Sequence, residues 1–190
     1  VMSLHVIHTL TVYRPADVVE TAECWALALE SSATPSVLAL SRQNLPQLRG
    51  EGDEDWSRQS NRSSRGAYRL RPASAPRQVV LVATGSEVAL ACDVRDALEA
   101  KGIGADVVSM PCMELFDAQD AAYRADVFPA DCLKISIEAG VTLGWQKYVG
   151  DGLTIGIDTF GASAPAEALF PYFGFSVEAI VPKIEARLAG

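Results

Sequence analysis

The segment Gln78-Val-Val-Leu-Val-Ala-Thr84 decides the fold, because it is a continuous apolar run of strand length that ends at Gly85-Ser86. A helical pattern then extends from Glu87 to Lys101, and Ala105-Asp-Val-Val-Ser-Met110 supplies the next apolar strand. A strand, helix, strand series of this kind predicts a right-handed βαβ crossover and a mostly parallel sheet. We therefore expect an α/β domain with three layers, a sheet between two layers of helices.

The same alternation continues to the end of the chain. Two further strands are predicted at Cys132–Glu138 and Leu153–Ile157, and helices at Ala118–Arg124, Ala164–Tyr172 and Val177–Leu188. No internal repeat is visible in the sequence.

Upstream of the deciding segment, the pattern predicts a helix and a strand that stand apart from it. Pro15–Leu29 begins with proline and aspartate, and its apolar side chains at helical spacing are Val18, Ala22, Trp25, Ala26 and Leu29. Ser36–Leu40 is a short apolar strand. Residues 44–77 are rich in Gly, Ser, Arg, Asp, Glu and Pro, so we interpret them as a linker between two domains.

Composition narrows the class of protein. The 190 residues are 49% hydrophobic and 21% charged, which favours a packed core. The net charge of −8 offers no basic face, so we expect no nucleic-acid partner. No apolar run approaches the roughly 20 residues of a membrane-spanning helix, so we expect no membrane partner. Four cysteines without CxxC spacing predict free thiols and a cytoplasmic location.

Several motifs invite a functional interpretation but have simpler ones. Gly85 lacks the further glycines of a nucleotide fingerprint, so Ser86 is expected to cap a tight strand-to-helix turn. Gly150-Asp151-Gly152 resembles part of a thiamine-enzyme metal motif, but no asparagine follows Asn61, and a turn is expected instead. His5 and His8 are expected to be solvated.

Several carboxylates in the sequence are candidates for acid–base groups. Asp117 with Asp120 could be drawn as a pair, and the cluster Glu51, Asp53, Glu54 and Asp55 is expected to be a solvated acidic loop. Glu138 ends an apolar strand, where ligands gather in open α/β sheets, and we expect it to bind backbone N–H groups in the next turn.

Arg42 is the strongest candidate for a binding residue. It follows a buried strand and is flanked by Ser41, Gln43 and Asn44. A planar guanidinium in that position can hold a phosphate bidentately. An intramolecular ion pair is the alternative.

Several of these motifs together resemble the transketolase family in order and spacing. They are Arg14-Pro-Ala-Asp17, Leu40-Ser-Arg-Gln-Asn-Leu45, Ala83-Thr-Gly-Ser-Glu-Val88, Val108-Ser-Met-Pro111, and Phe160-Gly161 with Ser163-Ala-Pro-Ala-Glu167. The resemblance runs from about residue 11 to residue 190, and the first ten residues depart from the family pattern, with His5-Val-Ile-His-Thr-Leu10 in place of its Arg and Pro-Asn.

The resemblance implies a fold and an activity. Residues 1–43 are similar to the end of the pyrimidine-binding domain, 44–77 to a linker, and 78–190 to the C-terminal domain. The family transfers a two-carbon ketol unit between sugar phosphates, in the pentose phosphate pathway or the Calvin cycle, as a homodimer. It uses thiamine diphosphate with Mg²⁺ or Ca²⁺.

Only Arg42 carries a family role over to this chain, as the arginine that holds the substrate's phosphate. No catalytic, cofactor-binding or metal-binding residue is implied here, so we expect the chain alone to be inactive and to bind no cofactor. Two alternatives stay open at this point. One is the C-terminal domain of another thiamine enzyme, such as deoxyxylulose-phosphate synthase or a 2-oxoacid dehydrogenase beta subunit; the other is a non-catalytic α/β binding module.

Overall fold

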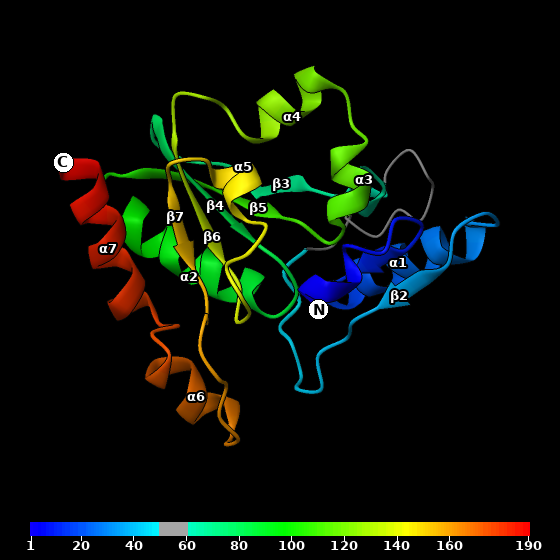
Figure 1. Cartoon of the computed structure of the whole chain (residues 1–190). Coiled ribbons are helices and arrows are strands. Elements are labelled where there is room, and N and C mark those ends of the chain that lie inside the picture. Colours follow the sequence, from blue (N-terminus) through cyan, green and yellow to red (C-terminus); the bar gives the residue numbers. More distant parts are fainter. Residues whose placement is uncertain (50–60) are drawn as a thin grey trace.

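A computed structural model describes residues 1–49 and 61–190 (Figure 1). Its centre is the predicted crossover, in which β4 (Arg77–Ala83) and β5 (Gly104–Ser109) are parallel neighbours joined by α2 (Glu87–Glu99). The five residues from Val79 to Ala83 are all fully buried, as expected for a strand covered on both faces. The βαβ prediction is therefore confirmed.

Three further strands complete a five-stranded sheet of order β3-β5-β4-β6-β7. β6 (Leu133–Ile137) and β7 (Leu153–Ile155) extend it in parallel, whereas β3 (Tyr68–Arg71) runs antiparallel to β5 at the other edge. The mostly parallel sheet is confirmed. However, β3 lies inside the predicted linker 44–77, and a linker interpretation is wrong for this part of it.

Helices cover both faces of this sheet, which confirms the three-layer prediction (Figure 1). On one face α2 and α7 (Val177–Ala189) pack on the odd-numbered side chains of β4. On the other face α3 (Met113–Asp117) and α5 (Gln146–Val149) pack on the even-numbered ones. The helix α6 (Ala166–Tyr172) precedes α7.

The helix predicted at Ala118–Arg124 corresponds to α4 (Ala121–Val127), which begins and ends three residues later, and a separate short helix, α3, precedes it. α3 ends at Asp117, and α4 begins after Asp120, whose Oδ1 accepts from the backbone N–H of Tyr123 at 2.8 Å. An aspartate that caps a helix start interrupts the preceding helix, so the predicted boundary was wrong.

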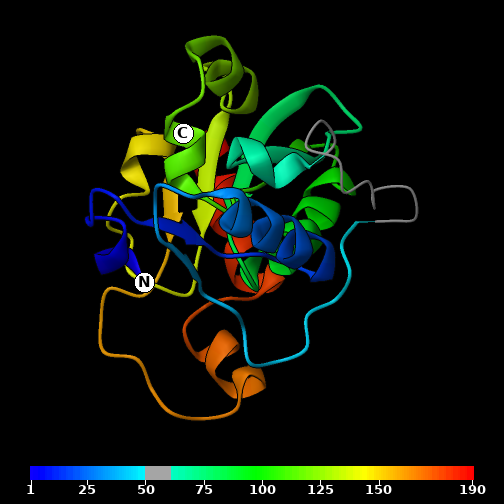
Figure 2. The ribbon, with the colours of Figure 1, turned by 90° about the vertical axis from the view of Figure 1, so that its right-hand side faces the viewer.

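The N-terminal residues form a smaller unit beside the large sheet (Figure 2). After a short 3-10 helix, η1 (Met2–Leu4), the chain forms β1 (Thr11–Tyr13), α1 (Val18–Glu30) and β2 (Ser36–Leu38). β1 and β2 pair in parallel, with Tyr13 opposite Leu38. The helix and the second strand match the prediction, and β1 is an addition to it.

The predicted face of α1 is wrong. Val18, Trp25 and Leu29 are 67%, 49% and 78% exposed, whereas the side that faces the rest of the chain carries Glu20 and Glu23. The other buried residues of this helix are Val19, Cys24 and Leu27. Hydrogen bonds to its carboxylates, described below, set this rotation.

Residues 61–66 also lie within the predicted linker, yet they are structured. η2 (Arg62–Arg65) is a 3-10 helix capped by Asn61, whose side chain accepts from Ser64 N–H, and Gly66 ends it with a positive φ of 79°. The predicted acidic loop Glu51, Asp53, Glu54 and Asp55 lies outside the described residues, so its prediction stays a prediction.

Cys24, Cys92, Cys112 and Cys132 are free thiols, as predicted. Burial raises the pKa of Cys24 and Cys112 well above the ordinary value, so both stay protonated and unreactive near neutral pH. Across residues 1–49 and 61–190, no helix has the length and apolarity needed to cross a bilayer.

Gly66 provides a test of how η2 packs on α3. A Cβ added there would lie 2.1 Å from Phe116 N, whereas at Gly102, with a similar φ of 78°, it would meet nothing within 4 Å. We expect Gly102→Ala to lower the free energy of unfolding by ~1–2 kcal/mol, the left-handed cost alone. Gly66→Ala should lower the free energy of unfolding by ~1–3 kcal/mol more than Gly102→Ala does, because the backbone at Phe116 must move to admit the methyl group. Urea denaturation of both variants checks this, and equal losses would contradict the packing.

Candidate functional site

Arg42 lies four residues beyond the carboxyl end of β2, in a loop on the surface of the smaller unit. Arg42, Gln43 and Asn44 are exposed and Ser41 is half-buried. In the described ranges, 1–49 and 61–190, no carboxylate lies within ion-pair distance of the Arg42 guanidinium. The alternative of an intramolecular ion pair therefore finds no support among these residues.

The loop that carries Arg42 is attached at both ends to the β1–α1 connection. At its start, Ala39 N–H donates to the carbonyl of Tyr13 at 2.8 Å. At its end, the Asp17 carboxylate accepts from Leu48 N–H at 3.1 Å and from Arg49 N–H at 3.2 Å. Asp17 also caps α1 by accepting from Glu20 N–H at 2.8 Å. One buried aspartate thus joins a helix start to the end of the loop.

A second group of charges lies where β4 and β6 end, the position at which ligands bind in open α/β sheets. There the guanidinium of Arg14, from the β1–α1 connection, donates to Glu138 and lies 3.9 Å from Glu87. Trp145 Nε1 donates to the other oxygen of Glu138 at 2.5 Å. Glu138 was predicted to bind backbone N–H groups, and this is wrong because an arginine and an indole occupy both its oxygens.

The backbone of Arg14 reinforces the same contact. Its N–H donates to Pro111 O at 2.8 Å, and its carbonyl accepts from Gly85 N–H at 3.1 Å. Burial lowers the pKa of the Arg14 guanidinium, and the nearby Glu87 carboxylate acts in the opposite direction. Arg14 therefore connects the smaller unit to the strand ends of the larger one through both side chain and backbone.

A crevice of about 980 Å³ opens beside this pair. Arg14, Glu138, His5, Glu114 and Lys147 line it, together with apolar residues of η1 and of the segment after β6. His5 Nδ1 lies 2.5 Å from Glu114 Oε1 and its side chain is 12% exposed, so the prediction of a solvated histidine is wrong for this residue.

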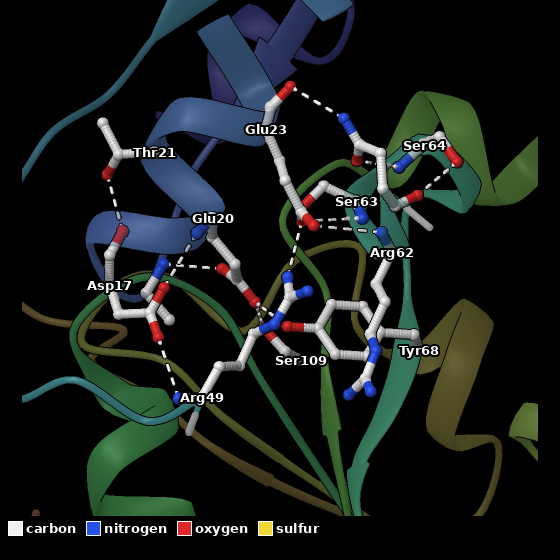
Figure 3. Close-up of polar contacts among 12 residues, drawn as sticks. Asp17, Glu20, Thr21, Glu23, Arg49, Arg62, Ser63, Ser64, Tyr68 and Ser109 are labelled. Carbon is white, nitrogen blue, oxygen red and sulfur yellow. Dashed lines mark hydrogen bonds and ion pairs between the residues drawn. The ribbon is translucent and has the colours of Figure 1, made fainter. Parts of the chain in front are cut away.

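The contact between α1 and the larger unit is made by buried carboxylates (Figure 3). Glu20 Oε1 accepts from Tyr68 Oη at 2.7 Å and from Ser109 Oγ at 2.5 Å, and Oε2 accepts from Ala16 N–H at 2.7 Å. Burial raises the pKa of Glu20 to about 7, although all three donors act to lower it. The neutral form of Glu20 is therefore more accessible near neutral pH than that of an exposed glutamate.

Glu23 makes the second such contact, one turn further along α1 (Figure 3). It accepts from Ser63 N–H and Oγ at 3.2 and 2.7 Å, from Arg62 N–H at 3.2 Å, and forms an ion pair with Arg49 at 2.7 Å. The side chains of Arg49 and Glu23 are each 1% exposed. Glu23 was missed because charged side chains on a predicted helix are usually solvated, and its partners were missed because they fell within the predicted linker 44–77.

A signal for this face was present in the sequence. Asp17, Glu20 and Glu23 recur every third residue, so they share one side of the helix. Cys24 and Leu27 belong to the same side. Acids interleaved with apolar residues on one side indicate a buried polar contact rather than a solvated face.

The remaining candidates have structural explanations. Ser86 precedes α2 but its hydroxyl donates to Glu87 rather than capping the helix, so the capping prediction is wrong. Asp151 lies in the turn before β7, as predicted, with its carbonyl accepting from Arg187. Among the residues that the structure covers, no three His, Cys, Asp or Glu side chains are close enough to hold a metal ion.

Two family models match the chain. The one described as "Transketolase-like TK C-terminal domain" covers residues 66–176, and the one described as "Transketolase, pyrimidine binding domain" covers residues 1–47. The second match begins at residue 1, so the likeness extends upstream of residue 11, where the sequence motifs begin.

Individual proteins match over nearly the whole chain. A transketolase of Rhodobacter capsulatus is 49% identical over 183 residues, which are 93% of this chain and 26% of that protein. The structure of transketolase from Leishmania mexicana matches with a TM-score of 0.85 at 44% identity, over 96% of this chain and 26% of that one. Transketolase from Pichia stipitis in complex with sedoheptulose-7-phosphate matches with a TM-score of 0.88 at 37% identity, over 99% and 26%. The chain thus spans about a quarter of the length of these proteins.

The pKa of Glu20 predicts how stability depends on pH. Because the folded pKa lies near 7 and the ordinary value is 4.5, folding favours the protonated form. The contribution of this group is complete below about pH 4.5 and is lost as the pH rises through 7. We expect the free energy of unfolding of the native chain, minus that of Glu20→Gln, to fall by up to ~1.4 kcal/mol per pH unit between pH 5 and 7. Urea titrations across pH 5–8 measure it; a constant difference would show that Glu20 is ionised throughout.

Proposed function

Because this chain belongs to the transketolase family, we propose that it is the C-terminal part of an enzyme that transfers a two-carbon ketol group between sugar phosphates. The observation that carries this proposal is Arg42, an exposed guanidinium without a carboxylate partner among the described residues, four residues beyond the carboxyl end of a parallel strand. Such a group can donate two parallel hydrogen bonds to the oxygens of a phosphate. The complex of the Pichia stipitis relative with sedoheptulose-7-phosphate supports this substrate class.

The division into domains follows from the same proposal. Residues 1–43 belong to a pyrimidine-binding domain, and the C-terminal domain extends to residue 190. The pairing of β3 with β5 supports moving the start of the C-terminal domain from residue 78 to about residue 66. The linker is then shorter than the predicted 44–77.

Thiamine diphosphate and a divalent ion, Mg²⁺ or Ca²⁺, are the cofactors that this activity requires. Residues of this chain do not fit the metal and its diphosphate, since the Gly150–Gly152 turn has no asparagine after it and the described acids form no metal cluster. We assign those ligands, and the group that activates the thiamine, to other parts of the longer enzyme. Arg42 then binds substrate and performs no proton transfer.

The enzyme is proposed to be a cytoplasmic homodimer that acts in the pentose phosphate pathway or the Calvin cycle. Free thiols support the compartment. The exposed apolar side of α1, with Val18, Trp25 and Leu29, supports coverage by a further domain or subunit.

The chain alone should bind no thiamine diphosphate and turn over no sugar phosphate, because it contributes a substrate contact without cofactor ligands. Calorimetric titration with thiamine diphosphate and Mg²⁺ measures the first, and a ketol-transfer assay the second, with the full-length enzyme as the positive control. Micromolar binding by the 190-residue chain would contradict the assignment of the cofactor site to other domains.

In the full-length enzyme, Arg42→Ala should lower kcat/KM for phosphorylated donors by about ten- to a hundredfold, the value of one charge-assisted contact. Most of the loss should appear in KM, because the phosphate is remote from the reacting carbonyl. Arg42→Lys should recover part of it, since lysine retains the charge without the planar fork.

The matched control for this variant is hydroxypyruvate, a donor without phosphate. Both the phosphorylated donor and hydroxypyruvate are assayed with a saturating acceptor that carries no phosphate. We expect Arg42→Ala to leave hydroxypyruvate kinetics nearly unchanged. Equal losses with both donors would mean that Arg42 supports the fold or the dimer, and the phosphate-binding role would be wrong.

A further inference from the structure

The exposed position of Arg42 raises the question of what fixes its guanidinium in space. Within residues 1–49 and 61–190 no side chain holds it by an ion pair, so its location depends on the loop of residues 39–49 that carries it. A bidentate contact requires the group within about 0.5 Å and 10–20° of its productive geometry. A loop held at one end only would not meet that requirement.

The start of this loop is fixed by ordinary sheet continuation. Ala39 N–H donates to Tyr13 O, which adds one bond to the β1–β2 ladder. Ser41 is half-buried and Arg42 to Asn44 are exposed, so contact with the protein body is lost soon after this bond.

The end of the loop is fixed differently, by charges that are out of reach of water. The Asp17 carboxylate, 4% exposed, accepts the backbone N–H groups of both Leu48 and Arg49. The side chain of Arg49 then turns inward to its ion pair with Glu23, and its guanidinium lies 5.6 Å from the centre of the Tyr68 ring. Leu48 O accepts from the Arg71 guanidinium of β3.

A buried ion pair contributes little net stability to a fold, because the cost of desolvating the two charges offsets most of their attraction. Such a pair can instead specify one arrangement of the chain, because separating the two buried charges is costly. Arg49 places such a pair at the end of the loop of residues 39–49, where its guanidinium lies 2.7 Å from the Glu23 carboxylate of α1.

We propose that Arg49 is a positioning residue for Arg42, and that its ion pair with Glu23 sets where the substrate's phosphate is held. This inference rests on the proposed function, in which Arg42 binds that phosphate. Arg49 contacts no substrate; it acts through the loop. Loss of Arg49 should therefore raise KM for phosphorylated substrates and leave KM for unphosphorylated substrates unchanged.

The test uses three variants of the full-length enzyme. Arg49→Met removes the guanidinium but leaves Glu23 with Ser63 N–H, Ser63 Oγ and Arg62 N–H as donors, so the Glu23 carboxylate keeps hydrogen-bond partners. Arg49→Lys retains the charge. Ser63→Ala is the matched control, because it takes one donor from the same carboxylate without touching the loop.

We expect Arg49→Met to raise KM for a phosphorylated donor about three- to tenfold, part of the loss expected for Arg42→Ala, with kcat within about twofold. KM for hydroxypyruvate should not change. Arg49→Lys should restore KM in part, and Ser63→Ala should lower the thermal midpoint without raising KM for either donor. If Ser63→Ala raises the KM for the phosphorylated donor as much as Arg49→Met does, the pair only supports the interface and the inference is wrong.

Amide hydrogen exchange of the same enzymes gives a readout that does not depend on activity. In the Arg49→Met variant, the backbone amide hydrogens of Leu48 and of residue 49 should exchange faster. The amide of Ala39 should keep its protection, because its hydrogen bond to the Tyr13 carbonyl is untouched. Unchanged exchange at Leu48 would overturn the anchoring role.

The two proposals fail in distinguishable ways. If Arg42→Ala is not selective for phosphorylated donors, the phosphate-binding role fails, whatever Arg49→Met does. If Arg42→Ala is selective but Arg49→Met is not, Arg42 binds phosphate and the positioning inference alone is wrong.

Discussion

Carboxylates withdrawn from water on one side of α1 are the constraint on which the rest of this structure depends. A buried charge without partners costs several kcal/mol, so Asp17, Glu20 and Glu23 each need donors from elsewhere in the chain. Those donors come from β3, β5, η2 and the end of the Arg42 loop. Only one rotation of α1 satisfies all of them, and it is a rotation that leaves several apolar side chains exposed.

The consequence extends from the helix to the strands beside it. Once α1 is fixed, the connection that precedes it is fixed as well, and Arg14 reaches the ends of β4 and β6 from there. The smaller sheet is therefore held on the larger unit from two directions, by the carboxylates of α1 and by the guanidinium of Arg14. A surface loop mounted on such a frame can hold a binding residue in place without contacts of its own.

The sequence was most informative where burial is continuous and least informative where polar residues are buried. β4 could be predicted because both its faces are covered, which leaves an unbroken apolar run. β3 was missed although Tyr68-Arg-Leu-Arg71 alternates as a half-buried strand does, because it is short and lies in a segment rich in Gly, Ser and Arg. Its Arg69 forms an ion pair with Asp106 of β5, far along the sequence. Pattern reasoning has no access to such partners. The location of Arg42 after a strand was predictable, whereas the attachment of its loop depends on contacts 31 and 32 residues away in sequence.

The pairing of Arg14 with Glu138 also governs how this protein could be recombined with its relatives. The two residues lie 124 positions apart, Arg14 in the part that matches the pyrimidine-binding-domain model and Glu138 in the part that matches the C-terminal-domain model. A chimera that inherits one of them without a matching partner loses this buried ion pair, even when each parental segment folds well by itself. Compatible crossovers must therefore be chosen by co-inheritance of charge pairs across the junction, and overall identity between the parents is a poor guide to which hybrids will assemble.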